Sequence, residues 1–186
     1  MTEWILLGLA ALLVLWLVVT YNRLVALRQT VGQAWSDIEV QLKQRHDLIP
    51  NLVETVKGYA AHERGTLEEV VRARNAAVSA QGPQAASAAE GQLSGALSRL
   101  FALAEAYPDL KANSNFSELQ GELSANETKI AAARRFFNSA VAEFNTAIQS
   151  IPAVLFAGAM GFTSRSFFEL DEAERAAVQA PPSVKF

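Results

Sequence analysis

The sequence predicts an all-α protein in which an N-terminal transmembrane helix continues into an antiparallel bundle of about four long helices, with a short apolar helix or extended tail at the C-terminus. The first observation is the stretch from Trp4 to Asn22, which contains no charged residue. The second is that apolar residues return at spacings of three and four through most of the remaining chain, which is the period of a helix face. No segment alternates apolar and polar residues as a half-buried strand does. The roughly 160 residues after residue 22 are enough for one domain with a core.

Residues 1–22 are predicted to be a transmembrane anchor. The hydrocarbon core of a bilayer is about 30 Å thick and needs roughly 20 mainly apolar helical residues to cross. Leu, Ile and Val supply eleven of the residues from Trp4 to Asn22, and together they favour insertion by about 3 to 6 kcal/mol. The residues expected to hold the anchor in the bilayer are Trp4, Leu6, Leu9, Leu13, Trp16 and Tyr21.

A cleaved signal peptide is the alternative for this segment. Such peptides begin with basic residues and end in a small-residue cleavage site. Here Glu3 is the only charged side chain before the apolar run, and no Ala-x-Ala pattern follows it, so an uncleaved anchor is favoured. Arg23 and Arg28 follow the anchor and no Lys or Arg precedes it. The positive-inside bias then puts the bulk of the chain in the cytoplasm, although the opposite side stays open.

The remaining chain, residues 23–186, is expected to form the helical bundle. The predicted helices cover residues 23–47, 48–78, 85–107 and 115–150, and residues 151–186 form a C-terminal segment. Pro50 is expected to end or kink the first helix, because proline disfavours helical geometry in the residue before it. Asp47 could then cap the second helix. Asn115 and Glu118 have the spacing of a capping box for the fourth.

The fourth predicted helix carries the longest apolar stripe of the chain. The stripe runs in near-heptad order from Phe116 to Ile151. That order suits packing within an antiparallel bundle, and it suits a coiled coil between copies of the chain equally well. Asn126 falls on the stripe, where a buried amide typically sets the register of packing rather than binding a ligand.

No arrangement of residues predicts catalysis, a metal or a cofactor. A di-iron bundle needs Glu-x-x-His on two helices, but Lys43 and Tyr59 stand three residues before His46 and His62. Both histidines are therefore expected on the surface or at its rim. Phosphate-binding loops and nucleophile elbows are also lacking in the sequence. The net charge of −3 and the scattered basic residues argue against nucleic-acid binding. The sequence therefore predicts a protein that is not an enzyme.

A second uncharged stretch runs from Phe144 to Ser164. A second spanning helix is disfavoured there, because Pro152, Gly158 and Gly161 interrupt it. The favoured interpretation is a short helix that folds back and closes the end of the bundle. The alternative is an apolar flap that docks on lipid or on a neighbouring subunit. The candidate interface residues for that alternative are Val154, Leu155, Phe156, Met160, Phe162, Phe167 and Phe168.

Several blocks of the sequence resemble the LemA family of bacterial membrane proteins. The longest are residues 21–28, 34–38 and 40–59, and the blocks near residues 134–138 and 144–152 are similar to the family's C-terminal signature. The resemblance implies a single N-terminal anchor in the bacterial cytoplasmic membrane, followed by a helical bundle. It brings no established enzymatic activity and no catalytic residues. Some relatives are associated with membrane-proteolysis systems, and one branch with bacterial organelle membranes.

These observations lead to two functional hypotheses. The first is a noncatalytic scaffold that self-associates at the membrane and organises or shapes it, with the lipid bilayer and other copies of itself as partners. The second is an adaptor that presents a helical surface to another membrane protein, such as a protease or an envelope-stress system.

Overall fold

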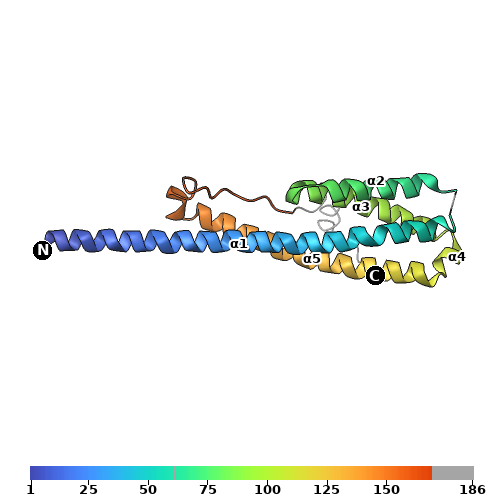
Figure 1. Ribbon diagram of the computed structural model, residues 1–186, viewed down its shortest axis with the longest axis horizontal. Coiled ribbons are helices and arrows are strands. Elements are labelled where there is room, and N and C mark those ends of the chain that lie inside the picture. The colour runs from blue at the N-terminus through green and yellow to red at the C-terminus, as the bar shows by residue number, and fades with distance from the viewer. Residues whose placement is uncertain (61, 169–186) are drawn as a thin grey trace, which may run out of the picture. The chain divides into compact units, whose positions relative to one another are not determined.

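The computed structural model describes residues 1–60 and 62–168, and every regular element within them is helical (Figure 1). In chain order these are α1 (Thr2–Lys57), α2 (Arg64–Ser79), α3 (Gly82–Ala104), the short α4 (Pro108–Lys111), α5 (Ser114–Gln149) and a 3₁₀ turn, η1 (Ala153–Leu155). The predicted all-α class with four long helices is confirmed. The part of the predicted C-terminal segment beyond residue 168 lies outside the described residues.

The predicted end of the first helix near Asp47 is wrong, because α1 continues through Pro50 to Lys57. Proline has no N–H, so Pro50 leaves the carbonyl of His46, four residues earlier, without its helical donor. Nε of Arg74, on α2, donates a hydrogen bond to that oxygen at 3.3 Å. Asp47 is consequently not a cap. Its carboxylate lies 2.7 Å from Nζ of Lys43, and that hydrogen bond lowers the pKa of Asp47.

The other helix boundaries differ from the predicted ones for local reasons. The second helix starts at Arg64 rather than residue 48, because α1 takes up residues 48–57. The third starts at Gly82, where a φ of +78° suits glycine, and Pro83 is tolerated in the first turn. The fourth, α5, is capped by Asn113 rather than Asn115: Oδ1 of Asn113 accepts a hydrogen bond from the Phe116 N–H at 3.0 Å.

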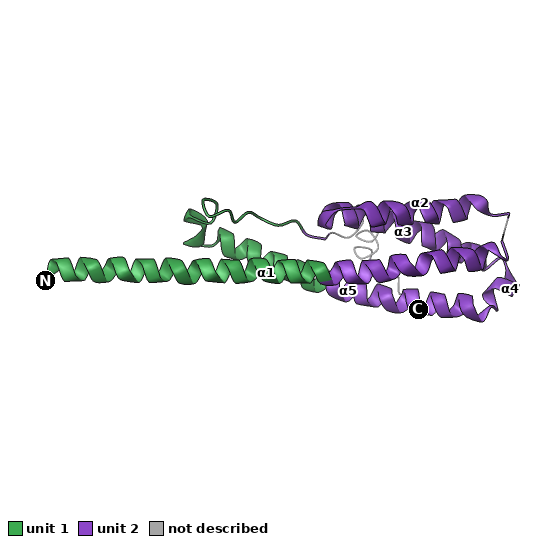
Figure 2. Cartoon of the chain, in the orientation of Figure 1, with its two compact units in different colours: residues 1–36, 135–166 green, residues 37–134, 167–186 purple. Residues whose placement is uncertain are grey.

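The chain divides into two compact units (Figure 2). Unit 1 consists of residues 1–36 and 135–166, and unit 2 of residues 37–134 together with Phe167 and Phe168 from the described tail. The helices α1 and α5 each contribute one part to unit 1 and another part to unit 2.

Unit 2 is a helical bundle around an apolar core. The contacts of Gln41 with Asn126 and of Tyr59 with Asn113 show that α1 and α5 run antiparallel here. Helices α2 and α3 pack side by side. The largest fully buried side chains of this unit are Ile38, Ile49, Leu52, Val56, Val70, Leu93, Leu100 and Leu110. Among them, Ile49, Leu52 and Val56 recur at spacings of three and four along α1, as the helical period predicts for a buried face.

Asn126 is buried, and its Nδ2 donates a hydrogen bond to the main-chain oxygen of Gln41 at 3.2 Å. This contact ties α5 to α1 at one position along both helices. The predicted structural role of this amide is therefore supported by its contact.

In unit 1 the remaining parts of α1 and α5 form an antiparallel pair. The rings of Trp35 and Phe137 lie 5.5 Å apart, and Leu24 and Phe144 are fully buried further along the pair. The stripe of α5 does not reach Ile151, because the helix ends at Gln149 and the Ile151 side chain is 86% exposed. Beyond that point the chain folds back along the pair.

Candidate functional site

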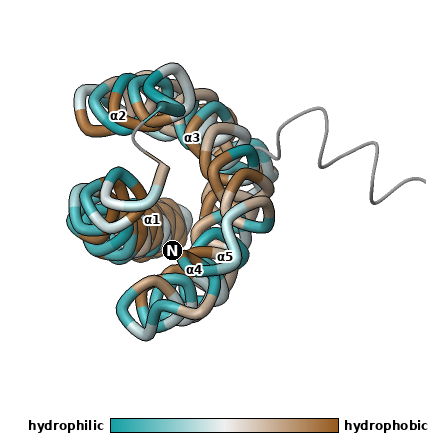
Figure 3. The backbone as a smooth tube through the Cα atoms, turned by 90° about the vertical axis from the view of Figure 1, so that its right-hand side faces the viewer, coloured by the Kyte–Doolittle hydropathy of each residue, from teal (hydrophilic) through white to brown (hydrophobic). Residues whose placement is uncertain are grey.

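The first candidate surface is the apolar part of α1. Among the described residues, one helix is long and apolar enough to cross a membrane, and none of its most apolar 18-residue window is buried. The brown colour of α1 beside the N label in Figure 3 marks this apolar stretch. The six predicted anchor residues all have accessible side chains: Trp4, Leu6, Leu9, Leu13, Trp16 and Tyr21. Only the end of this surface near Trp16 and Tyr21 is contacted by other parts of the described chain, namely the rings of Phe156 and Phe162. The residues before Trp16 stay exposed, as expected of a helix whose surroundings are lipid.

The structure divides the candidate interface residues near the C-terminus into two groups. Val154, Leu155, Met160 and Phe167 are exposed, and Leu155 reaches 81%. Phe156 is partly buried. Phe162 and Phe168 are buried within their own chain.

Phe162 holds the returning chain against the helix pair of unit 1. Its ring lies 5.6 Å from that of Tyr21 and 6.4 Å from that of Phe144, and the Arg28 guanidinium lies 5.3 Å from the ring centroid. Phe162 therefore packs as the favoured interpretation of a folded-back segment predicts, whereas its exposed neighbours do not.

Beside these residues, unit 1 contains a cleft of about 540 Å³, here called the unit 1 cleft. One wall is formed by the end of the apolar part of α1, and the other by small residues of α5. Arg23 and Glu143 are the charged residues of the lining. The cleft is lined by Trp16, Val19, Thr20, Arg23, Leu24, Ala142, Glu143, Thr146, Ala147, Ser150, Ile151, Pro152 and Ala153. Small side chains of this kind let another helix approach closely.

A buried polar cluster lies in unit 2 and was not predicted. Oε1 of Glu90, on α3, is 2.5 Å from Nε2 of His46, and its Oε2 accepts from Nη1 of Arg45 at 3.1 Å. The other terminal nitrogen of Arg45 reaches Ser94 Oγ at 2.8 Å and Glu127 Oε2 at 3.3 Å. The cluster joins α1, α3 and α5.

The prediction that both histidines lie at the surface is wrong for His46, which is only 7% exposed, and right for His62. The sequence did carry a signal for the cluster. Glu90 falls between Ala86 and Leu93 on the buried face of α3, where a lone charge needs a partner. Both carboxylate oxygens of Glu90 have found partners, so the arrangement is that of a structural ion cluster rather than a reactive site. Within residues 1–60 and 62–168, no three acidic or histidine side chains gather as metal ligands would.

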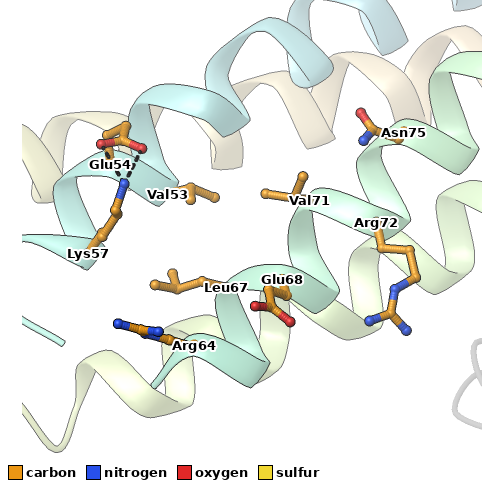
Figure 4. Close-up of a pocket in the computed structure, with 9 residues that line it drawn as sticks. All are labelled: Val53, Glu54, Lys57, Arg64, Leu67, Glu68, Val71, Arg72 and Asn75. Atoms are coloured by element: carbon orange, nitrogen blue, oxygen red, sulfur yellow. Dashed lines mark hydrogen bonds and ion pairs between the residues drawn. The ribbon is translucent and has the colours of Figure 1, made fainter. Parts of the chain in front are cut away.

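A groove between α1 and α2 is the second candidate surface, here called the α1–α2 groove. In Figure 4 the side chains of Val53, Leu67 and Val71 face the space between the two helices, and charged residues surround them. The volume is about 690 Å³. Its charged and polar rim consists of Glu54, Lys57, Arg64, Glu68, Arg72 and Asn75. An apolar floor with a charged rim is the usual form of a groove that receives a helix or peptide.

Comparison with known proteins gives relatives at low identity. The chain is 26% identical over 178 residues to the magnetosome protein MamQ of Magnetospirillum gryphiswaldense. The alignment covers 82% of this chain and 65% of that protein. The chain is 25% identical to the magnetosome protein MamQ 2 of Paramagnetospirillum magneticum, and this alignment covers 82% of this chain and 66% of that protein. Protein LemA of Metamycoplasma hominis is 27% identical over 158 residues, with 83% of this chain and 71% of that protein covered. The match thus spans about two thirds of the length of the MamQ proteins.

The sequence pattern of the LemA family matches residues 34–186, which is most of the chain. It begins after the apolar part of α1 and includes the buried cluster and the α1–α2 groove. Together with the apolar helix, these matches indicate a membrane-associated helical protein, and none of the relatives carries the name of an enzyme. By this match, which confirms the resemblance noted from the sequence blocks, the chain belongs to the LemA family.

Proposed function

We propose that this chain is a noncatalytic scaffold, anchored in the bacterial cytoplasmic membrane by a single span, which associates with further copies of itself and organises or shapes the membrane. The observation that carries the proposal is the continuity of α1. One helix of 56 residues contains both the exposed apolar anchor and the first buried helix of unit 2. No loop separates the two, so contacts made by the bundle act directly on the anchor.

Two apolar features of unit 1 support self-association. Phe136 is 54% exposed on α5, next to the buried Phe137. The unit 1 cleft offers small residues beside the end of the anchor, as helix-to-helix contacts in membranes typically do. The MamQ relatives are named as magnetosome proteins, and a structural role at a membrane is compatible with that name.

Native mass spectrometry of the full-length chain extracted in mild detergent tests self-association. We expect multiples of the 20.1 kDa chain mass. The dissociation constant of a Phe136→Ser variant should rise by about ten- to a hundredfold, because a phenylalanine buried at an interface contributes about 1.5 to 3 kcal/mol. Val78→Ser is the matched control, since Val78 is an exposed apolar residue on α2 in unit 2, and it should leave the oligomer unchanged. A strictly monomeric wild-type particle contradicts the proposal.

The proposed sidedness follows from Arg23 and Arg28, the basic residues nearest to the anchor. The chain has no cysteine, so Val78→Cys introduces a single thiol on unit 2. We expect a membrane-impermeant maleimide to label it only after the cells are permeabilised. Labelling of intact cells would place the bulk of the chain on the outer side instead.

An adaptor for another membrane protein is the second candidate, and the α1–α2 groove favours it. The Val71 side chain is 43% exposed above the buried Leu67, so a partner helix could cover it. Crosslinking in cells should then recover one dominant heterologous protein, and Val71→Arg should abolish that product by placing a charge on the apolar floor. Recovery of self-crosslinks alone favours the scaffold.

A further inference from the structure

Residues 151–162, here called the C-terminal turn segment, combine an apolar composition with outward-pointing side chains. The chain has no charged residue between Glu143 and Arg165. Ile151 is 86% exposed and Leu155 81%, and Val154 and Met160 are also exposed. Four large apolar side chains therefore point away from the protein within ten residues of one segment, and they form an apolar patch that needs a cover.

The tip of the segment lies against the apolar part of α1. The ring of Phe156 packs edge-on against Trp16 at 6.0 Å, and Pro152 and Ala153 share the unit 1 cleft with Trp16 and Val19. Trp16 precedes Asn22 by six residues, or about 9 Å along the helix axis. If α1 spans the bilayer up to Tyr21, as the proposed function holds, the part of the segment next to Trp16 lies below the headgroup level, at the depth of acyl chains.

The backbone of the segment is suited to that depth, because a chain entering lipid must satisfy its own N–H and C=O groups. The N–H groups of residues 154–157 donate to carbonyls of residues 150, 152 and 153, at 2.8 to 3.1 Å. Those of residues 160–162 donate to carbonyls of residues 156–158, at 3.0 to 3.2 Å. These successive turns pair most of the backbone donors of the segment without water.

The polar attachments of the segment all lie on the side expected to face water. Phe162 is buried under the Arg28 guanidinium. Oδ1 of Asn145 accepts from the Arg165 N–H at 2.8 Å, and its Nδ2 donates to the Arg165 carbonyl at 2.9 Å. The segment is thus fixed at its polar end, and its apolar tip extends along α1 toward the anchor.

We propose that residues 151–161 insert into one leaflet of the bilayer beside α1, at the end of the anchor near Asn22, with Ile151, Val154, Leu155 and Met160 in contact with acyl chains. The occupant of this apolar patch is lipid. The segment then adds cross-section to a single leaflet, which gives the proposed membrane-shaping role a physical basis. It depends on α1 spanning the membrane but not on self-association.

Spin labels on single cysteines test the insertion, since the natural chain has none. Full-length Val154→Cys and Leu155→Cys chains, labelled with a nitroxide and reconstituted into lipid vesicles, are compared in their collisions with oxygen and with a water-soluble nickel chelate. Leu13→Cys, in the anchor, is the lipid reference. Val78→Cys is the matched water reference, because Val78 and Val154 are exposed to nearly the same extent, 53% and 47%.

We expect the ratio of oxygen to nickel collisions at positions 154 and 155 to approach that at position 13 and to exceed that at position 78 severalfold. A ratio equal to that at position 78 overturns the proposal, because it puts the segment in water. Low collision rates with both reagents also overturn it, because they indicate a protein surface such as a second copy. In both cases a lipid signal at position 13 leaves the anchored scaffold standing, whereas a water signal at position 13 refutes the membrane anchor itself.

Discussion

Arg45 and Glu90 show what a charged side chain contributes when it is buried. The side chains of Arg45 and Glu90 are less than 10% accessible, and each carries hydrogen bonds that replace water. Removing one partner of such a group leaves the others buried without compensation, which costs far more than the intact pair contributes. The exposed pair of Glu54 and Lys57, by contrast, remains hydrated on both sides.

We expect Glu90→Ala to lower the free energy of unfolding by about 3 to 5 kcal/mol. Glu90→Gln should cost less, because the amide retains a hydrogen-bond acceptor. Denaturant titration of the helical circular dichroism in detergent micelles measures both. Glu54→Ala is the control, and its effect should stay within about 1 kcal/mol. Equal losses in the free energy of unfolding for Glu90→Ala and Glu54→Ala would show that the buried cluster contributes no more to stability than an exposed ion pair does.

Arg74 and Pro50 should act together, although they are on different helices. Arg74→Met removes the donor to the His46 carbonyl and should cost about 1 to 3 kcal/mol. In a Pro50→Ala background, the new N–H of residue 50 can bond that carbonyl within the helix, so the same substitution should cost less. A double-mutant cycle in the same unfolding assay should give a coupling of about 1 kcal/mol. Strict additivity contradicts this explanation, and Arg72→Met, an exposed arginine on the same helix, should show no coupling.

At the scale of the element, the continuity of α1 is the feature on which the proposed function depends. Gly32 lies inside this helix, where glycine loses more backbone entropy than alanine on folding. A Cβ atom built at Gly32 meets no other atom within 4 Å. Gly32 therefore lowers the stability of α1, and no close contact at this position requires a glycine.

Gly32→Ala should raise the free energy of unfolding by about 0.5 to 1 kcal/mol, as measured by denaturant titration. Gly82→Ala provides the opposite case at the start of α3. There is space around Gly82 too, but its φ of +78° disfavours a side chain, so a loss of about 1 to 2 kcal/mol is expected. A loss on Gly32→Ala would mean that α1 bends at Gly32 in a way that requires glycine.

At the scale of the whole molecule, attachment to the membrane depends on the summed insertion free energy of many apolar residues, each of which contributes little. Two charges near the middle of the anchor are enough to reverse that sum. Leu9→Arg combined with Leu13→Arg adds about 5 to 7 kcal/mol, more than the about 3 to 6 kcal/mol by which the anchor favours insertion. Leu9 and Leu13 precede Trp16, the residue that contacts the C-terminal turn segment, by seven and three residues along α1.

We therefore expect alkaline carbonate to extract the Leu9→Arg, Leu13→Arg chain from membranes while leaving the wild-type chain in the pellet. Val78→Arg, the same change on the exposed surface of unit 2, should remain in the pellet. A doubly substituted chain that resists extraction would show that other parts of the molecule suffice to hold it in the membrane.

The anchor, the buried helix faces and the family blocks could be predicted from the sequence, because each depends only on residues that are close together along the chain. The anchor follows from composition alone. The buried faces of Leu24, Ile38, Phe137 and Phe144 follow from a spacing of three and four. The family blocks likewise consist of residues that are contiguous in sequence.

The tertiary structure decided what depends on partners far away in the chain. The end of α1 was mispredicted because the local rule for Pro50 takes no account of a donor 24 residues later on α2. The burial of His46 required α3 to bring Glu90 against it, 44 residues away. In the C-terminal turn segment the apolar residues look alike in sequence, and only packing against α1 turned Phe162 inward and left Leu155 outside. Periodicity and composition are local properties and can be read from the chain, whereas the partner of a buried polar group or an exposed apolar one is set by how distant segments meet.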